Sequence, residues 1–200
     1  MDHKFDTTIH KIQNDELTRT KMFQIRENAK ALLLKGEIRA QEVIDAINLK
    51  AVPELEAYYV FMGFCPGADL ENRLDEKWTE EGICEFNFIQ SETQLKQFCE
   101  IHTGDTMILK KRETFGETQN LSYHGKVTGV SDSKVTGLRY LRVDWKKPSK
   151  FLIVPLMGCN ATVNLRKLEV VERDLPKEFW GWLASGERTV KTKNQKNKVS

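Results

Sequence analysis

Long hydrophobic runs and cysteine-rich patterns are missing from this sequence. No apolar stretch approaches the length of about 18 residues that a membrane-spanning helix needs, and the N-terminal residues lack the apolar segment of a signal peptide. The 200 residues include four cysteines, and no two of them form a CxxC pair. Such sparse thiols do not make a disulfide scaffold and are typical of reduced, cytosolic proteins. We therefore expect a cytoplasmic protein with no membrane partner.

An excess of charge of one sign is also lacking. The chain has 31 lysines and arginines against 29 aspartates and glutamates, which gives a formal net charge of +2. A chain this close to neutral has no overall field that would attract nucleic acid or an anionic membrane. Hydrophobic residues make up 40% and charged residues 30% of the sequence, which is typical of a globular chain that buries a core. Composition therefore predicts a folded protein but names no partner.

The common catalytic and cofactor motifs are absent. No GxxxxGK[ST], GxGxxG or GxSxG segment occurs, which excludes a P-loop, a dinucleotide fingerprint and a nucleophile elbow. Cys99 and His102 form one half of a zinc-ligand pattern, but a structural zinc site needs a second such pair. Cys159 with His124 is conceivable as a thiol and base, although a buried cysteine is more often a small hydrophobic residue. We expect no cofactor and no metal.

Two acid–x–lysine triplets leave a nuclease alternative open. Asp144 and Lys146 would share one face of a strand, the arrangement in which an acid and a lysine flank a metal-bound phosphate. Asp75 and Lys77 fall in a helical pattern, where positions two apart diverge. No second acidic pair precedes Asp144, so a solvated strand edge is the simpler interpretation. We expect no catalytic residues.

The chain divides into three parts by pattern. Apolar residues recur three to four positions apart over residues 1–52, with a helix stop at Gly36, which predicts a helical hairpin. Residues 57–172 hold short β-rich segments separated by glycines, with one or two helices between them, as in a small bent barrel. Residues 173–200 combine one docked helical turn with a lysine-rich end, and we expect a basic, partly disordered tail. The predicted class is α+β, with strands expected at 58–64, 106–111, 123–130, 138–145, 151–156, 162–165 and 168–171.

Five ordered segments resemble the EVE domains of the PUA-like superfamily. They are Tyr58–Gly63, Asn72–Ile83 with its Trp-Thr-Glu-Glu-Gly-Ile, Ile101–Lys110 with its Gly-Asp turn, Gly125–Thr128 with its Gly-x-Val-Thr, and Leu141–Trp145. The resemblance covers residues 58–171 and is closest to the EVE-like domain at the N-terminus of restriction ATPases that cut modified DNA. It implies a PUA-like or EVE-like barrel whose pocket accepts a flipped, often modified base between aromatic walls.

The sequence also supplies residues that suit such a pocket. Candidates for the aromatic walls are Phe61, Phe64, Trp78 and Trp145, and backbone groups near Met62 and Gly63 would read a base edge. Candidates for phosphate contacts are Lys110, Lys111 and Lys126. A core role competes with the pocket role for each ring, because aromatic side chains bury a large apolar area.

These observations favour a non-catalytic nucleic-acid-binding module, with DNA preferred over RNA. It would act with a separate effector protein in DNA modification or defence. Three alternatives remain: an RNA-binding PUA-like protein, an assembly subunit with a vestigial pocket, and an enzyme using Asp144 or Cys159. In the assembly alternative residues 1–52 dock a partner or form a homodimer.

Overall fold

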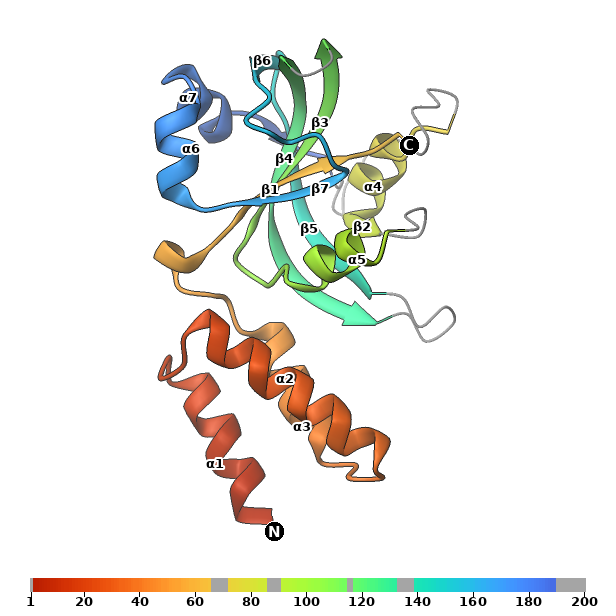
Figure 1. Cartoon of the computed structure of the whole chain (residues 1–200), viewed down its shortest axis with the longest axis vertical. Helices are drawn as coiled ribbons and strands as arrows, with labels where there is room; N and C mark the ends of the chain where they lie inside the picture. The colour runs from red at the N-terminus through yellow and green to blue at the C-terminus, as the bar shows by residue number, and fades with distance from the viewer. Residues whose placement is uncertain (1, 66–71, 86–90, 115–116, 133–138, 190–200) are drawn as a thin grey trace, which may run out of the picture.

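A computed structural model describes residues 2–65, 72–85, 91–114, 117–132 and 139–189. Three helices lie at one end of the molecule, and a curved sheet with helices on both faces forms the other end (Figure 1). This arrangement confirms the α+β class. No helix in these ranges is long and apolar enough to cross a membrane.

The N-terminal part is a three-helix bundle, so the predicted hairpin is wrong in helix number. The helices are α1 (Asp2–Gln13), α2 (Arg19–Leu34) and α3 (Ala40–Leu49). They pack around an apolar core that includes Ile12, Met22, Ala29, Val43, Ile44 and Ile47. The apolar spacing runs on across the break between α1 and α2, where Asp15 has a positive φ of 58°. Periodicity alone therefore did not reveal the turn.

Eight strands form one mixed sheet in the described residues. They are β1 (Tyr59–Gly63), β2 (Ile83–Glu85), β3 (Thr106–Thr114), β4 (Thr118–Asp132), β5 (Arg139–Lys147), β6 (Leu152–Pro155), β7 (Val163–Arg166) and β8 (Glu187–Arg188). The order is β2-β5-β4-β3-β1-β7, with β6 added on β4 and β8 on β5. Strands β1 and β3 are parallel, and the other neighbours are antiparallel.

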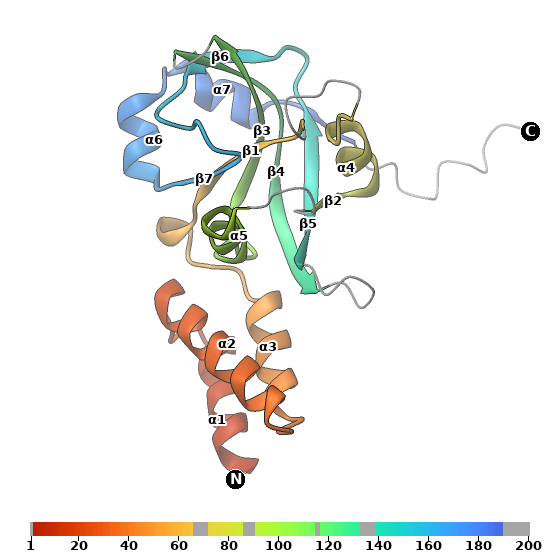
Figure 2. The ribbon, with the colours of Figure 1, turned by 45° about the vertical axis from the view of Figure 1, so that its right-hand side comes forward.

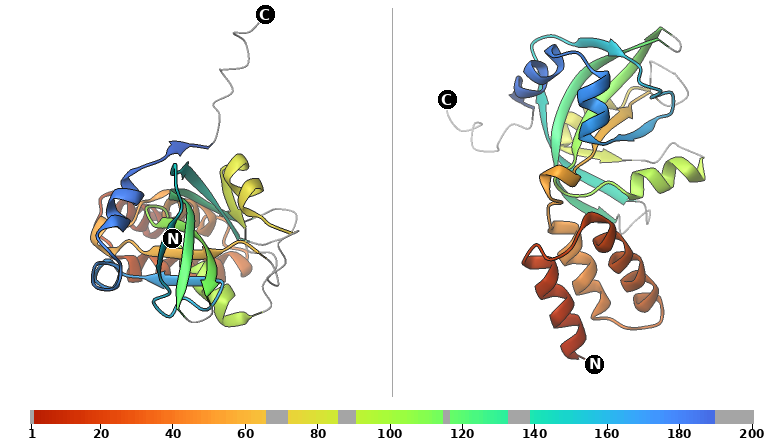
Figure 3. Two further views of the ribbon diagram at one scale, coloured as in Figure 1. Left: turned by 90° about the horizontal axis from the view of Figure 1, so that it is seen from above. Right: turned by 60° about the vertical axis from the view of Figure 1, so that its left-hand side comes forward.

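The sheet is bent but not closed. Register shifts interrupt the β3–β4 ladder at Leu109/Lys110 and the β4–β5 ladder at Val127/Gly129, and such irregularities bend and twist strands. The curvature of the long β4 and β5 is visible in Figure 3. No ladder joins the end strands β2 and β7 within the described ranges. The sheet is therefore mostly open, and the expected small bent barrel is not confirmed.

Helices cover the two faces of the sheet (Figure 2). On one side lie α4 (Asp75–Glu81) and α5 (Glu92–Cys99), and on the other lie α6 (Leu168–Asp174) and α7 (Glu178–Ala184). A short 3-10 helix, Glu54–Glu56, precedes β1. The first core contains Trp78, Phe98, Met107, Leu109, Val127 and Trp145. The second core contains Phe61, Ile108, Leu121, Val154, Val171, Phe179 and Trp182.

Two predictions about the C-terminal region are corrected. Residues 168–171, expected as a strand, begin α6, because Val171 and Leu175, four positions apart, both pack in the second core. Residues 173–189 are an integral part of the fold, since Phe179 and Trp182 are buried and β8 pairs with β5. Disorder was expected from Glu187 onward, but Glu187–Arg188 form β8; residues 190–200 lie outside the described ranges.

A buried ion pair joins the helical bundle to the sheet. The Arg19 guanidinium contacts both carboxylate oxygens of Asp105, at 2.6 and 2.8 Å. That carboxylate also accepts the backbone N–H groups of Tyr58 and His102, each at 2.8 Å. Arg19 further lies over the Tyr58 ring at 4.0 Å from its centroid. The Gly-Asp turn is therefore the centre of the contact between the two parts.

Candidate nucleic-acid interface

The aromatic rings that were expected to wall a base pocket are core residues. Phe61 and Met62 are neighbours on β1, so their side chains point to opposite faces of the sheet and enter different cores. Trp78 and Trp145 are fully buried in the first core, and the Trp145 indole donates to the carbonyl of Ile83 at 3.0 Å. Packing covers both faces of these rings, so in this structure they offer no surface on which a base could stack.

The other two pocket candidates are also occupied by the fold. Phe64 is 4% exposed, and the Arg73 guanidinium lies 5.5 Å from its ring centroid. The Gly63 N–H donates to the carbonyl of Thr162 at 2.8 Å. The expected pocket built from these β1 residues is therefore not formed here.

The three lysines expected at phosphates have different surroundings. Lys110 is buried, and its ammonium donates to the backbone carbonyls of Cys159 and Ala161. Burial lowers the pKa of Lys110 to about 8. Lys111 and Lys126 are exposed, but they lie apart in the β3–β4 ladder: Lys126 pairs with Thr106 at one end, and Lys111 pairs with Asn120 further along. Lys110 is therefore excluded from phosphate contact in this structure.

The residues of the enzyme alternatives are engaged in other contacts of the fold. The Nε2 of His124 donates to the carbonyl of Ser185 at 2.8 Å, whereas Cys159 lies against Lys110 and is fully buried. Burial raises the pKa of the Cys159 thiol, which disfavours the thiolate that a nucleophile needs. Asp144 is paired with Arg188 at 2.9 Å. His124, Cys159 and Asp144 are each held by a contact other than the one that the enzyme alternatives require.

The Cys99–His102 pattern does not develop into a metal site in the described residues. No group of three or more histidine, cysteine, aspartate or glutamate side chains is placed there to hold a metal ion. His102 is 1% exposed, and both of its ring nitrogens lack a hydrogen-bond partner among the described residues. Burial, with the charges of Arg26, Arg19 and Arg139, lowers the pKa of His102 to about 2. The ring is thus a neutral core group at physiological pH.

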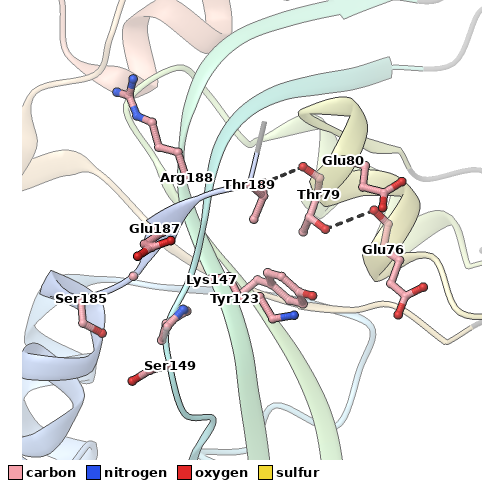
Figure 4. Close-up of a pocket in the computed structure, with 12 residues that line it drawn as sticks. Glu76, Thr79, Glu80, Tyr123, Lys147, Ser149, Ser185, Glu187, Arg188 and Thr189 are labelled. Carbon is pink, nitrogen blue, oxygen red and sulfur yellow. Dashed lines mark hydrogen bonds between the residues drawn. The ribbon is translucent and has the colours of Figure 1, made fainter. Parts of the chain in front are cut away.

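A cavity of about 750 Å³ lies between α4 and β8, and we call it the α4–β8 cavity. Its lining comes from α4, β4, the end of β5 and the segment through β8, and comprises Glu76, Thr79, Glu80, Tyr123, Lys147, Pro148, Ser149, Ser185, Gly186, Glu187, Arg188 and Thr189. Tyr123 and Lys147 lie between α4 and β8 in Figure 4. The volume is within the range of about 300–1,000 Å³ that is usual for ligand pockets.

Local contacts hold the two walls of the α4–β8 cavity in place. The Thr189 hydroxyl donates to the carbonyl of Thr79 in α4 at 2.6 Å (Figure 4). The Thr189 N–H donates to the carbonyl of Trp145 at 3.0 Å. Gly186 has a positive φ of 102°, and a Cβ at that position would lie 2.9 Å from the nitrogen of Pro148. The chain can therefore turn closely around the end of β5 into β8.

The α4–β8 cavity places the edge of a largely buried ring beside polar groups of both charges: Tyr123 lines it, is 8% exposed and packs in the first core. The Lys147 ammonium lies 5.6 Å from the centroid of the Tyr123 ring. Glu76, Glu80 and Glu187 contribute carboxylates to the lining, and all three residues are exposed. Carboxylates and hydroxyls accept hydrogen bonds from amino groups, while the ring edge and the lysine stem provide apolar contact. The arrangement suits a flat, amino-bearing ligand.

A second hollow of about 470 Å³ lies on the other face of the sheet, under α7, and we call it the α7–sheet groove. Its lining is Glu54, Tyr59, Thr106, His124, Gly125, Lys126, Asp144, Lys146, Trp180, Leu183, Ala184 and Arg188. Arg188 is shared with the α4–β8 cavity, and in Figure 4 it points away from Tyr123. The short β8 therefore separates two hollows that share one residue.

Two titratable groups of the α7–sheet groove are shifted toward their neutral forms. Burial lowers the pKa of His124; the hydrogen bond to Ser185 partly opposes this, and the charge of Lys146 adds to the lowering. Burial also raises the pKa of the Tyr59 hydroxyl, and the charges of Glu54 and Glu172 raise it further. Both rings are consequently uncharged near neutral pH, and the positive charge comes from lysine and arginine side chains.

The fold and these hollows define an α+β protein whose bent, open sheet carries a polar cavity and a basic groove on either side of one short strand. No protein-family model matches the sequence, and no curated protein matches it. The resemblance to EVE domains therefore stays a prediction.

Sequence reasoning missed most of the residues that line these hollows. Tyr123 was placed at the start of an expected strand, while Trp180 and Arg188 were assigned to the tail. A strand or helix pattern shows which residues alternate, but it does not show which rings remain partly exposed after packing. The one available signal was the aromatic density of residues 179–182, which is unusual for a solvated tail.

Proposed function

We propose that this protein is a non-catalytic nucleic-acid-binding module whose α4–β8 cavity accepts one unstacked base. The observation that carries the proposal is the cavity itself, with the Tyr123 ring and the Lys147 stem beside carboxylate and hydroxyl acceptors. Flipping a base costs a few kcal/mol, which aromatic contact and edge hydrogen bonds offset. DNA is the first target to test, in keeping with the EVE-like segment order.

The polar lining of the α4–β8 cavity supports a base rather than a phosphate as the occupant. Three glutamates face two cations, Lys147 and Arg188, and Arg188 points away from Tyr123 (Figure 4). A phosphate would meet repulsion from these carboxylates, whereas an exocyclic amino group would donate to them. We therefore expect the carboxylates to accept hydrogen bonds from a base edge, and the phosphates to lie elsewhere on the molecule.

The test fills the α4–β8 cavity without changing a core. Ser149 is exposed at its lining, so Ser149→Trp places an indole where the base would enter. Ser91→Trp is the matched control, because Ser91 is also exposed and makes no side-chain cap to its helix. Fluorescence anisotropy with labelled single strands and mismatched duplexes measures binding. Loss of aromatic contact worth about 1–3 kcal/mol predicts about 5- to 150-fold weaker binding for Ser149→Trp.

Two results would contradict this proposal. One is equal affinity of Ser149→Trp, Ser91→Trp and the wild type for every oligonucleotide. The other is no binding of any DNA or RNA oligonucleotide by the wild type at low salt. Tighter binding of RNA than of DNA of the same sequence would support the RNA-binding alternative.

A specific observation favours assembly as a second candidate function. Leu34 is 90% exposed and Ile38 is 79% exposed, on either side of the turn between α2 and α3. Exposed apolar side chains of this size favour contact with another protein surface, and the occupant we consider is a second copy of this chain. Light scattering would test it: a dimeric mass that becomes monomeric in Leu34→Glu/Ile38→Glu would support assembly, and a monomeric wild type would exclude it.

A further inference from the structure

The α7–sheet groove combines aromatic rings with a row of cations. Tyr59 and Trp180 are half-buried and meet edge to face, with centroids 5.9 Å apart and planes at 87°. Trp180 is also supported by Phe179, at 5.2 Å and 75°. Rings fixed in this way need little further ordering before a base stacks on them.

The cations of the α7–sheet groove lie on three adjacent strands. Lys126 on β4 pairs in register with Asp144 on β5, and Lys146, two residues further along β5, pairs with Arg188 on β8. Adjacent strands are about 4.8 Å apart, so Lys146 on the middle strand has Lys126 on one neighbouring strand and Arg188 on the other, all lining the same groove. Asp144 is engaged by Arg188 at 2.9 Å. Glu54 on the rim is the other carboxylate of the lining.

We propose that the α7–sheet groove binds the nucleotide next to the base held in the α4–β8 cavity. Its base stacks on the Tyr59–Trp180 pair, and its phosphate lies against Lys126, Lys146 and Arg188. This inference rests on the proposed function. It explains where the phosphates lie, because the acidic cavity repels them and the basic groove begins one strand away at the shared Arg188.

The experiment compares binding of a single 2′-deoxynucleoside with binding of a tetranucleotide. Lys126→Glu reverses an exposed charge of the groove, and Lys111→Glu is the matched control, an exposed lysine on β3 that does not line the groove. We expect Lys126→Glu to weaken binding of a labelled deoxyribo-tetranucleotide about tenfold and to reduce the slope of log affinity against log salt by about one. Binding of the single 2′-deoxynucleoside, which has no phosphate, should be unchanged.

A second variant tests the aromatic part separately. Trp180→Phe keeps an aromatic ring in contact with Phe179 but removes the indole. We expect the tetranucleotide to quench the tryptophan fluorescence of the wild type and to quench that of Trp180→Phe much less.

The outcomes separate this inference from the proposed function. Suppose that Ser149→Trp abolishes tetranucleotide binding, while Lys126→Glu and Trp180→Phe bind as tightly as the wild type. The proposed role of the groove would then be wrong, and the proposed function would stand. Absence of binding to any nucleoside or oligonucleotide overturns both proposals. If Lys111→Glu weakens tetranucleotide binding as much as Lys126→Glu does, the proposed role of the groove is also wrong, because the effect would then come from the overall charge of the protein.

Discussion

His102 is a neutral imidazole enclosed by cationic side chains. Its pKa is about 2, because burial and the charges of Arg26, Arg19 and Arg139 oppose protonation. In the unfolded chain the same group has an ordinary pKa of about 6.5. Between these two values the unfolded state binds a proton at His102 and the folded state does not. The free energy of unfolding must therefore fall as the pH decreases below about 6.5.

This difference gives a pH prediction for His102→Gln. From pH 7 to pH 5 the wild type should lose about 2 kcal/mol more free energy of unfolding than the variant, since each pKa unit is worth about 1.4 kcal/mol. Urea unfolding at several pH values measures both curves, and titrations common to the two proteins cancel in their difference. Parallel curves would show that His102 takes up its proton in the folded state.

Lys110 shows how one residue type serves different purposes in one strand. Its ammonium holds the β6–β7 connection through the carbonyls of Cys159 and Ala161, while neighbouring Lys111 is exposed. Both were expected at phosphates because two adjacent lysines look alike in a sequence. The two residues are neighbours on β3 and therefore face opposite sides of the strand, but the local pattern does not show that the β6–β7 connection covers the side of Lys110.

At the scale of elements, β5 packs tightly against Gly125 of β4. Gly125 pairs with Trp145. A Cβ at Gly125 would lie 2.6 Å from the backbone oxygen of Asp144 and 2.8 Å from a methyl of Val143. Gly129 lies in the same strand, and a Cβ there would have its nearest neighbour, the Cδ of Arg142, at 3.8 Å. The sequence shows two strand glycines, but the structure distinguishes their roles.

We therefore expect Gly125→Ala to destabilise the protein by about 2 kcal/mol, the usual cost of overpacking against backbone that cannot move far. Gly129→Ala is the matched control and should change the free energy of unfolding by less than about 0.5 kcal/mol. Thermal and urea unfolding of the two variants test this. Equal stabilities would mean that β4 and β5 separate at Gly125 without cost.

At the scale of the whole molecule, the Arg19–Asp105 pair connects two separately packed parts. The helical bundle has its own core, and the sheet has two. Arg19 also donates to the carbonyl of Glu100, so the guanidinium has acceptors in the turn as well as the carboxylate. A buried pair with this many hydrogen bonds is costly to break, because the remaining charge stays without its partner.

Asp105→Asn should lower the free energy of unfolding by about 3 kcal/mol. Asp6→Asn is the matched control: the Arg39–Asp6 contact is also 2.6 Å long, but the Asp6 side chain is 61% exposed. Exposed pairs contribute about 0–1 kcal/mol. Calorimetry and urea unfolding measure both variants, and a loss in Asp105→Asn no larger than in Asp6→Asn would contradict a central role for the pair.

Local sequence patterns predicted the helices and strands whose burial repeats over neighbouring positions. Helical spacing indicated the N-terminal helices, and alternation or apolar runs indicated β1, β3, β5 and β6, because burial of one face imposes a period on the chain. The α+β class follows from those local patterns. The pattern also implied apolar burial for Trp78 and Trp145, although it did not say whether a core or a ligand would cover them.

The positions of the α4–β8 cavity and the α7–sheet groove follow from contacts between distant parts of the chain. The cavity wall depends on Thr189 bonding to Thr79, 110 positions earlier, and the groove depends on α7 lying over β1, β4 and β5. Such contacts join residues that share no local period, so no window of sequence contains them. For the same reason, the sequence did not reveal that the sheet stays open, that Trp180 is only half-buried, or that Lys110 is buried.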